Sequence, residues 1–254
     1  MAEAGARTGA RLAASPIADG GTPVDIWTGW QHSFAPLNLG DCNGLTVIAP
    51  HPDDETLGLG ATVAMLCAAG VDVQVVSVSD GGAAHPGVGA AGRAELESVR
   101  RAEVRRAVRR LGAGEPVRLG MPDGELARHE RRLTEQIAAL LADFPAGRWC
   151  AATWRGDGHP DHEAVGRAAA AAAAETGAVL VEYPVWMWHW ARPDDPAVPW
   201  RRARRADLTD EALNLKRLAV QYFTSQTQPT PDGYTVLPPA VVSRLLAVGE
   251  VVFV

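Results

Sequence analysis

Short apolar runs alternate with helix-forming segments over most of this 254-residue chain. The run Leu45–Ala49 and the valine-rich run over 71–79 are typical of strands buried on both faces of a sheet. Between such runs lie longer amphipathic segments, for example over 93–111, which ends before Gly112. Strands that alternate with helices of this length form βαβ units, so the pattern predicts an α/β fold with a mainly parallel sheet flanked by helices.

The remaining predicted elements continue this alternation. We expect helices over 57–69, 130–143, 160–176 and 210–222, and strands over 117–119, 150–154 and 179–183. After Pro184 the chain becomes rich in Trp and Pro, which we interpret as a C-terminal excursion of the same domain. Because no repeat or linker-like composition interrupts the chain, we expect a flexible tail over residues 1–21 and a single domain over 22–254.

Composition excludes several classes of protein. Lys and Arg number 24 and Asp and Glu number 30, for a net charge of −6, which disfavours a nucleic-acid partner. No apolar run is long enough to predict a membrane span, and the first residues do not resemble a signal peptide. Cys42, Cys67 and Cys150 form no CxxC pair, which argues against disulfides and a thiolate zinc site. We therefore expect a cytoplasmic protein.

Histidine and aspartate are concentrated in two segments, each directly after a predicted strand. The six side chains are His51, Asp53, Asp54, His159, Asp161 and His162. The carboxyl ends of parallel strands meet at one edge of a sheet, so we expect both segments in one cleft. Imidazole and carboxylate together suit zinc or another divalent first-row metal, and a hydrolytic zinc site needs three protein ligands and an open position for water.

Each His-Pro segment also has a purely structural interpretation, as a helix start whose aspartates favour the positive end of the helix dipole. Two such segments at equivalent strand ends favour the metal site. Adjacent Asp53 and Asp54 cannot point the same way, so one can bind a metal while the other faces water. The spacing does not say which of the two does which.

Taken together, these segments resemble a known family. Ala-Pro-His-Pro-Asp-Asp-Glu-Thr-Leu-Gly over 49–58 and Gly-His-Pro-Asp-His over 158–162 are similar to the motifs of LmbE-like (PIG-L) zinc-dependent N-deacetylases. Further similar positions are Arg100 with Glu103, Leu111-Gly112, the segment 119–124, Lys216 and Ser225-Gln226. The resemblance covers roughly 45–226. It implies a Rossmann-like fold, one zinc ion per chain at the strand ends, and removal of an acetyl group from an N-acetylglucosaminyl-type substrate.

The resemblance also implies a role for each residue. The implied metal ligands are His51, Asp54 and His162. Asp53 would act as general base toward the water activated by the metal. His159, if protonated, would stabilise the oxyanion together with the metal. Asp161 would orient a catalytic histidine, His159.

Two regions depart from the motifs or lie beyond them. Ser79-Asp80-Gly81-Gly82 lacks the acid that ends the corresponding family loop, and the following loop over 82–92 is either a lid or a surface connection. Trp186, Trp188 and Trp190 would share one side of a period-two stretch. Such a stripe is typical of a core or of a subunit interface in a homo-oligomer, and its alternative is a stacking surface for a sugar or an aromatic aglycone.

With what the resemblance implies, we expect a zinc-dependent deacetylase of a small N-acetylated sugar or glycoconjugate. One alternative is an amidase of a sugar–thiol conjugate, which would need the same site with another acyl pocket. A second is a non-catalytic glycan-binding module of the same fold. A nucleotide-binding Rossmann protein is disfavoured because no G-x-G-x-x-G follows the first predicted strand.

Overall fold

The computed structural model describes residues 10–30, 33–144 and 147–254. Its strands are β1 (Ala35–Leu37), β2 (Leu45–Ala49), β3 (Val73–Ser79), β4 (Val117–Met121), β5 (Trp149–Thr153), β6 (Val179–Tyr183), β7 (Ala203–Ala206) and β8 (Val251–Phe253). Its α-helices are α1 (Ala10–Ala14), α2 (Val24–Thr28), α3 (Asp54–Ala68), α4 (Ala90–Arg110), α5 (Glu130–Ala142), α6 (Pro160–Thr176), α7 (Met187–Trp190), α8 (Asp210–Val220), α9 (Thr224–Thr227) and α10 (Pro239–Ala247).

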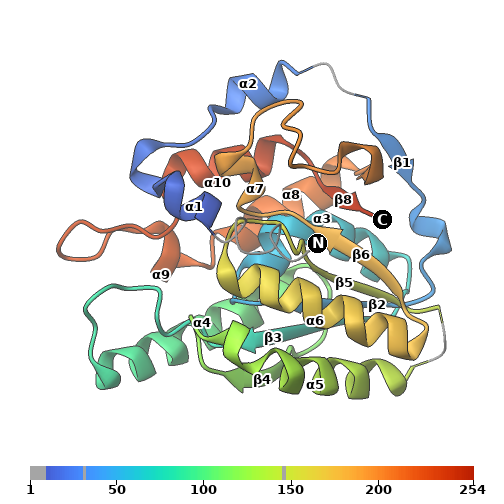
Figure 1. The fold of residues 1–254 in the computed structure, drawn as a ribbon, viewed down its shortest axis with the longest axis horizontal. Coiled ribbons are helices and arrows are strands. Elements are labelled where there is room, and N and C mark those ends of the chain that lie inside the picture. Colours follow the sequence, from blue (N-terminus) through green and yellow to red (C-terminus); the bar gives the residue numbers. More distant parts are fainter. Residues whose placement is uncertain (1–9, 31–32, 145–146) are drawn as a thin grey trace.

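All eight strands form one sheet in the order β1-β7-β8-β6-β5-β2-β3-β4. Neighbouring strands from β6 to β4 run parallel, and β8 is antiparallel to both β6 and β7. Helices α5 and α6 lie on one side of the sheet and α3, α8 and α10 on the other (Figure 1). The prediction of an α/β fold with a mainly parallel sheet is confirmed.

The strand β2 shows why the core is built in two layers. Leu45 and Val47 face the helices of one side, and Ile48 faces those of the other. A strand with apolar residues on both faces must lie in the interior of the sheet, and β2 pairs with β3 and β5. Since β2 and β5 are neighbours, the segments that follow them lie side by side. These are the two segments rich in His and Asp.

The alanine-rich helix α6 lies unusually close to the sheet. Gly166 faces β5, where an added Cβ would lie 2.4 Å from the carbonyl oxygen of Thr153. Ala168, Ala169 and Ala172 are buried on the same helix. Small side chains therefore hold the helix that begins with the second His/Asp segment against the carboxyl end of β5.

Both ends of the described chain take part in the fold. Residues 10–21, expected within a flexible tail, form α1 and the turn Ile17–Asp19, while residues 1–9 lie outside the described residues. The C-terminal excursion contributes β7 and β8 to the same sheet. None of the described helices is long and apolar enough to cross a membrane.

The predicted one-sided tryptophan stripe is wrong, because the stretch is helical. The carboxylate of Asp157 accepts hydrogen bonds from the backbone N–H groups of residues 185, 186 and 187, each at 2.9 Å, and α7 begins there. Trp186 consequently lines a cavity, whereas Trp188 packs edge-on against Trp27 with 5.0 Å between ring centroids. The indole N–H of Trp190 donates a hydrogen bond to the backbone carbonyl of Asp157.

Candidate active site

The segment after β2 makes a sharp turn that separates two adjacent carboxylates. Asp53 has a φ angle of 139°, a backbone conformation that is rare outside glycine and that costs about 1–3 kcal/mol. Its carbonyl accepts hydrogen bonds from the N–H groups of Thr56 and Leu57, so α3 begins immediately after it. Asp54 is the first helical residue. The Asp53 side chain contacts Arg100, whereas the Asp54 side chain contacts His51.

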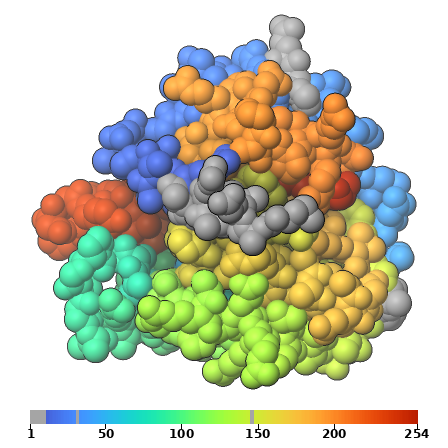
Figure 2. Space-filling view, viewed as in Figure 1, coloured from blue at the N-terminus to red at the C-terminus, as the bar shows by residue number. Residues whose placement is uncertain are grey.

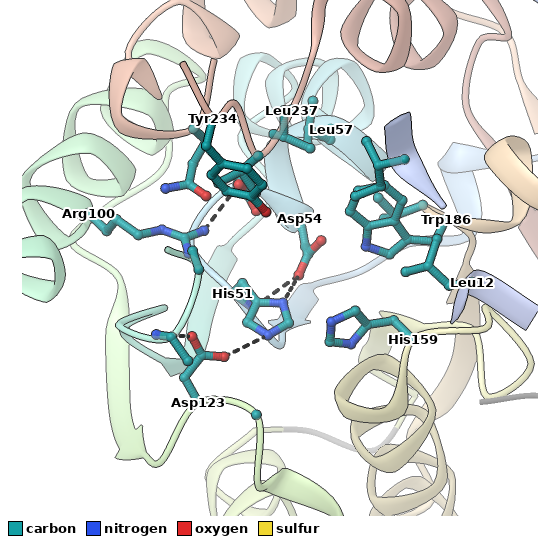
Figure 3. A pocket seen from close by; sticks show the side chains of 18 residues that line it. Leu12, His51, Asp54, Leu57, Arg100, Asp123, His159, Trp186, Tyr234 and Leu237 are labelled. Carbon is teal, nitrogen blue, oxygen red and sulfur yellow. Dashed lines mark hydrogen bonds and ion pairs between the residues drawn. The ribbon is translucent and has the colours of Figure 1, made fainter. Parts of the chain in front are cut away.

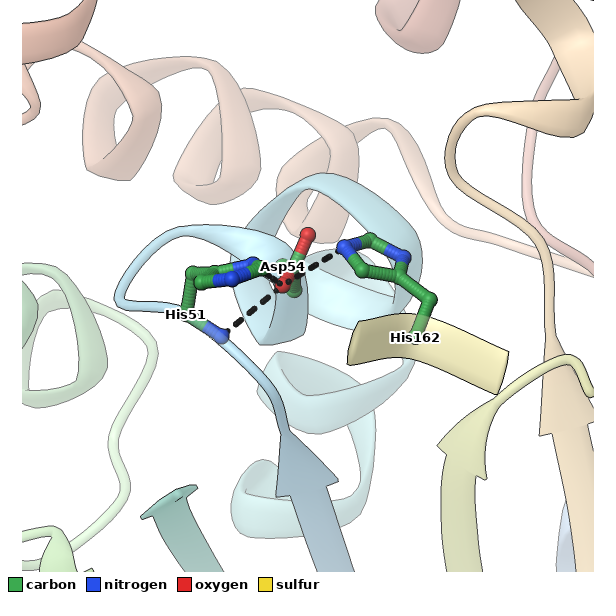
Figure 4. Close-up of side chains that lie close together, drawn as sticks. All are labelled: His51, Asp54 and His162. Carbon is green, nitrogen blue, oxygen red and sulfur yellow. Dashed lines mark hydrogen bonds and ion pairs between the residues drawn. The ribbon is translucent and has the colours of Figure 1, made fainter. Parts of the chain in front are cut away.

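His51, Asp54 and His162 form a compact group of candidate metal ligands (Figure 4). Oδ2 of Asp54 lies 3.2 Å from Nδ1 of His51 and 3.3 Å from Nε2 of His162. The ligand atoms of the three residues all lie within 4.8 Å of one another. These are the three residues that the resemblance implied, and the structure brings them together from the ends of β2 and β5.

The environment of His162 fits a metal ligand. Its Nδ1 lies 2.8 Å from Oδ2 of the fully buried Asp157, which fixes the ring. Its Nε2 is also buried, and among the described residues it makes no hydrogen bond of good geometry; Oδ2 of Asp54 lies 3.3 Å away. A metal-binding imidazole characteristically has one nitrogen on a carboxylate and its other lone pair on the cation. The donor set of two imidazoles and one carboxylate suits zinc or a similar divalent ion.

A second group of potential ligands shares His51. Nε2 of His51 lies 3.1 Å from Oδ1 of Asp123 and 3.4 Å from Oδ2 of Asp161. The Asp161 carboxylate also accepts backbone N–H groups from Gly124 and Leu126, at 2.7 and 3.0 Å. We interpret these two carboxylates as the groups that orient His51, so that its Nδ1 faces Asp54 within the candidate ligand group.

The carboxylate cluster favours positive charge at this position. Burial alone would lower the pKa of His51, but hydrogen bonds to Asp123, Asp161 and Asp54 hold it well above its usual value. Burial would likewise lower the pKa of His162, yet Asp54 and Asp157 raise it to about 9. A cation bound by the imidazole nitrogens would take the place of these protons.

Asp53 belongs to neither ligand group among the described residues. Its Oδ2 accepts a hydrogen bond from the buried guanidinium of Arg100 at 3.1 Å. Burial raises the pKa of Asp53 to about 8, with Asp54 and Glu55 adding to the rise and Arg100 opposing it. A buried carboxyl group therefore lines the cavity beside the candidate ligands and is held by a different partner.

His159 lies at the start of α6, beside the ligand group. Burial, together with the neighbouring His162 and His51, lowers its pKa to about 3, so a neutral ring is favoured. Its Nδ1 accepts the backbone N–H of Asp161 at 3.2 Å, which leaves Nε2 as the protonated nitrogen. His159 can therefore donate a hydrogen bond without carrying a charge. The carboxylate of Asp161, which the resemblance assigned to His159, contacts His51 instead.

Three further residues of the site had no role in the sequence analysis. Arg100 and Asp123 stood only among the family-like positions, and Asp157 lies two residues before His159. Each contacts a candidate ligand or the candidate base; Arg100 and Asp123 reach partners after β2 from other elements, whereas Asp157 contacts His162 within its own segment. The position of Asp157 at a strand end, inside a His/Asp segment, was the one signal available.

A cavity of about 290 Å³ opens over this group of residues (Figure 3). Its lining combines the polar groups described above with side chains from the N- and C-terminal parts of the chain. The lining residues include Leu12, Ile17, His51, Asp53, Asp54, Leu57, Arg100, Asp123, His159, Val185, Trp186, Gln226, Tyr234, Val236 and Leu237.

Replacing Asp157 with asparagine is expected to weaken metal binding by about 10–100-fold, because His162 loses the carboxylate that orients it. A competition titration against a chromogenic chelator measures the affinity. Asp143→Asn, at an exposed position after α5, is the matched control. Because Asp157 also holds the start of α7, thermal unfolding is followed in parallel. An unchanged metal affinity would show that Asp157 serves α7 alone.

Comparison with known proteins places this arrangement in a family. The sequence profile of the PIG-L family, described as GlcNAc-PI de-N-acetylase, matches residues 46–173. The 1D-myo-inositol 2-acetamido-2-deoxy-α-D-glucopyranoside deacetylase of Mycobacterium avium is 35% identical over 150 residues, which cover 46% of this chain and 47% of that protein. The diacetylchitobiose deacetylase of Thermococcus kodakarensis is 30% identical over 127 residues, which cover 50% and 47% respectively.

Solved structures show the same fold. The crystal structure of a conserved protein from Thermus thermophilus aligns with a TM-score of 0.57 and 28% identity, covering 79% of this chain and 84% of that one. The chain spans about half the length of the curated relatives it matches. The profile match contains both His/Asp segments, with all three candidate ligands. By this match the chain belongs to the PIG-L family.

Proposed function

We propose that the protein is a zinc-dependent hydrolase that removes the acetyl group from an N-acetylglucosaminyl-type substrate. The observation that carries the proposal is the buried Nε2 of His162, which makes no hydrogen bond of good geometry among the described residues and lies in one group with Asp54 and His51. The buried carboxylate of Asp53 lines the same cavity and lies outside that ligand group. The names of the relatives from M. avium and T. kodakarensis support an acetamido sugar as the substrate.

The metal would be held by His51, Asp54 and His162. When bound, it would acidify a water molecule and polarise the amide carbonyl. Asp53 accepts the proton of the attacking water, held in position by Arg100. The same proton is then available for the leaving nitrogen, so that the amide and water become acetate and an amine.

His159 acts on the oxygen of the carbonyl. With Nδ1 occupied by the backbone N–H of Asp161, its Nε2–H is the donor available toward the cavity. A hydrogen bond from this group is worth most where negative charge develops during attack. The expected role of His159 thus does not require the protonated ring that the family resemblance suggested.

Metal analysis combined with amine release tests the proposal. We expect about one zinc ion per chain, release of free amine from N-acetylglucosaminides, loss of this activity after chelation and its return with Zn²⁺. Amine release only from a sugar–thiol conjugate carrying another acyl group would favour the amidase alternative. Saturable glycan binding without amine release by the zinc-loaded protein would identify a binding module and contradict the proposal.

A further inference from the structure

The cavity over the candidate metal site is divided by polarity. In Figure 3 the polar side chains His51, Asp123 and His159 lie along its lower edge, and apolar side chains lie along its upper and right edges. We call the latter the apolar side; it consists of Leu12, Ile17, Leu57, Val185, Trp186, Val236 and Leu237, with Tyr234 at its rim. An acetyl group and a water molecule do not require an apolar surface of this extent.

The family profile matches residues 46–173. Most side chains of the apolar side come from parts of the chain before or after that range. Leu12 and Ile17 belong to the N-terminal segment, which we define as residues 10–22. Val236 and Leu237 follow α9. Figure 2 shows the blue N-terminal part packed against the orange C-terminal part on one face of the molecule. The two His/Asp segments lie inside the profile match, whereas these side chains lie outside it and form the apolar side of the same cavity.

The N-terminal segment is anchored by buried polar groups. Arg244, which is 2% exposed, donates hydrogen bonds to the carbonyl of Gly20 and to Nδ1 of His189. Nε2 of His189 lies 3.1 Å from the carbonyl oxygen of Ser15, and its own carbonyl accepts the N–H of Thr22 at 2.9 Å. Contacts of this kind at both ends of the turn Ile17–Asp19 fix where Ile17 and Leu12 lie.

The same segment contacts the loop that carries His159. A Cβ added to Gly158 would lie 2.6 Å from the indole nitrogen of Trp190 and 3.3 Å from the backbone nitrogen of Leu12. The guanidinium of Arg11 lies over the Trp190 ring, 4.7 Å from its centroid. The apolar side of the cavity thus packs directly against the loop that carries His159.

We propose that the substrate is an N-acetylated amino sugar with an apolar aglycone, an alkyl or aryl group that lies against Leu12, Ile17 and Trp186. The inference rests on the proposed function, because the acetamide must reach Asp53 and His159, and an acetyl group leaves the apolar side unfilled. A free hexose would expose hydroxyl groups to apolar side chains and leave water against them. Each methylene that the aglycone buries strengthens binding by about four-fold.

Three substrates distinguish the occupants of the apolar side. Zinc-loaded protein is given N-acetylglucosamine, its hexyl glycoside below the micelle concentration, and N-hexanoylglucosamine, and kcat/KM is measured by amine release. We expect kcat/KM for the hexyl glycoside to exceed that for the free sugar by about ten-fold or more. The Leu12→Ser variant should lower this ratio of kcat/KM values several-fold. Ile26→Ser, which removes a side chain that is 46% exposed on α2, is the matched control and keeps the ratio.

The inference would be overturned if the two substrates had nearly equal kcat/KM values in the unchanged protein. It would also be overturned if the ratio of the two values were the same in Leu12→Ser as in the unchanged protein. A preference for N-hexanoylglucosamine would overturn it as well, because the acyl chain would then occupy the apolar side. If no substrate releases amine, the proposed function fails and calorimetric binding to the Asp53→Asn variant decides instead. Tighter binding of the hexyl glycoside than of the free sugar, weakened by Leu12→Ser, supports the apolar subsite, and equal binding of the two contradicts it.

Discussion

Replacing Asp53 with asparagine is expected to lower kcat by about 10²–10⁴-fold while the zinc content stays that of the unchanged protein. The amide oxygen can still accept the hydrogen bond of Arg100, but it cannot take a proton from water. Asparagine also tolerates a positive φ better than most residues, so the turn before α3 is preserved. The expected result is a folded, metal-loaded and nearly inactive protein.

Amine release and elemental analysis on the same preparation measure both quantities. Asp143→Asn supplies a change of the same chemistry at an exposed position and should leave both unaltered. Loss of zinc from the Asp53 variant would mean that Asp53 is a ligand. Full activity would mean that another group accepts the proton.

A second large effect is expected at Glu250, where alanine should lower the free energy of unfolding by about 3–5 kcal/mol. The helix α3 is broken at Leu59, whose φ is −135°, and the N–H groups of Ala61 and Thr62 beyond the break donate to the Glu250 carboxylate at 2.8 Å each. Nζ of Lys216 lies 2.8 Å from the same carboxylate. Alanine would leave two N–H groups and one ammonium group buried without a partner.

Urea denaturation monitored by circular dichroism measures this loss. Glu135→Ala removes a carboxylate from an exposed pair with Arg131 and should cost about 0–1 kcal/mol. Combining Glu250→Gln with Lys216→Met removes both charges, and this double variant should be more stable than Glu250→Ala. A loss below about 1 kcal/mol for Glu250→Ala would show that water reaches the break in α3.

The central strands and the helices between them were predictable because local pattern and burial agree. The run Leu45–Ala49 is apolar at four of its five positions, and the strand it forms is buried on both faces. The start of α3 lies at Asp54, earlier than apolar periodicity indicated, because the first turn consists of acidic residues that favour a helix N-terminus.

The tryptophan stretch was not predictable from local pattern. Its alternation suggests an extended segment, but the carboxylate of Asp157 accepts three consecutive N–H groups and starts a helix there. A partner 28 residues away in the chain thus overrides the local preference. The same limit applies to the N-terminal segment, whose composition suggests a tail and whose anchor, Arg244, lies 224 residues from Gly20.

The candidate site was predictable in part. Strand position predicted that the two His/Asp segments meet, and the family resemblance implied His51, Asp54 and His162, which the structure brings within one group. The groups that orient these ligands could not be paired from sequence, because Asp123 reaches His51 from the end of another strand. The direction of the Asp161 carboxylate depends on backbone N–H groups of the turn at Gly124 and Leu126, which no spacing rule provides.

The break in α3 also bears on the order of events during synthesis. Asp54 lies at the beginning of that helix, and the donors of its second half find their protein partner 189 residues later, at Glu250. While the ribosome is still short of that residue, those N–H groups have only water to bind. In a nascent chain that ends before Glu250, Asp54 therefore begins a helix whose second half lacks its protein partner, and we expect the ligand group to reach its final arrangement only after β8 has been made.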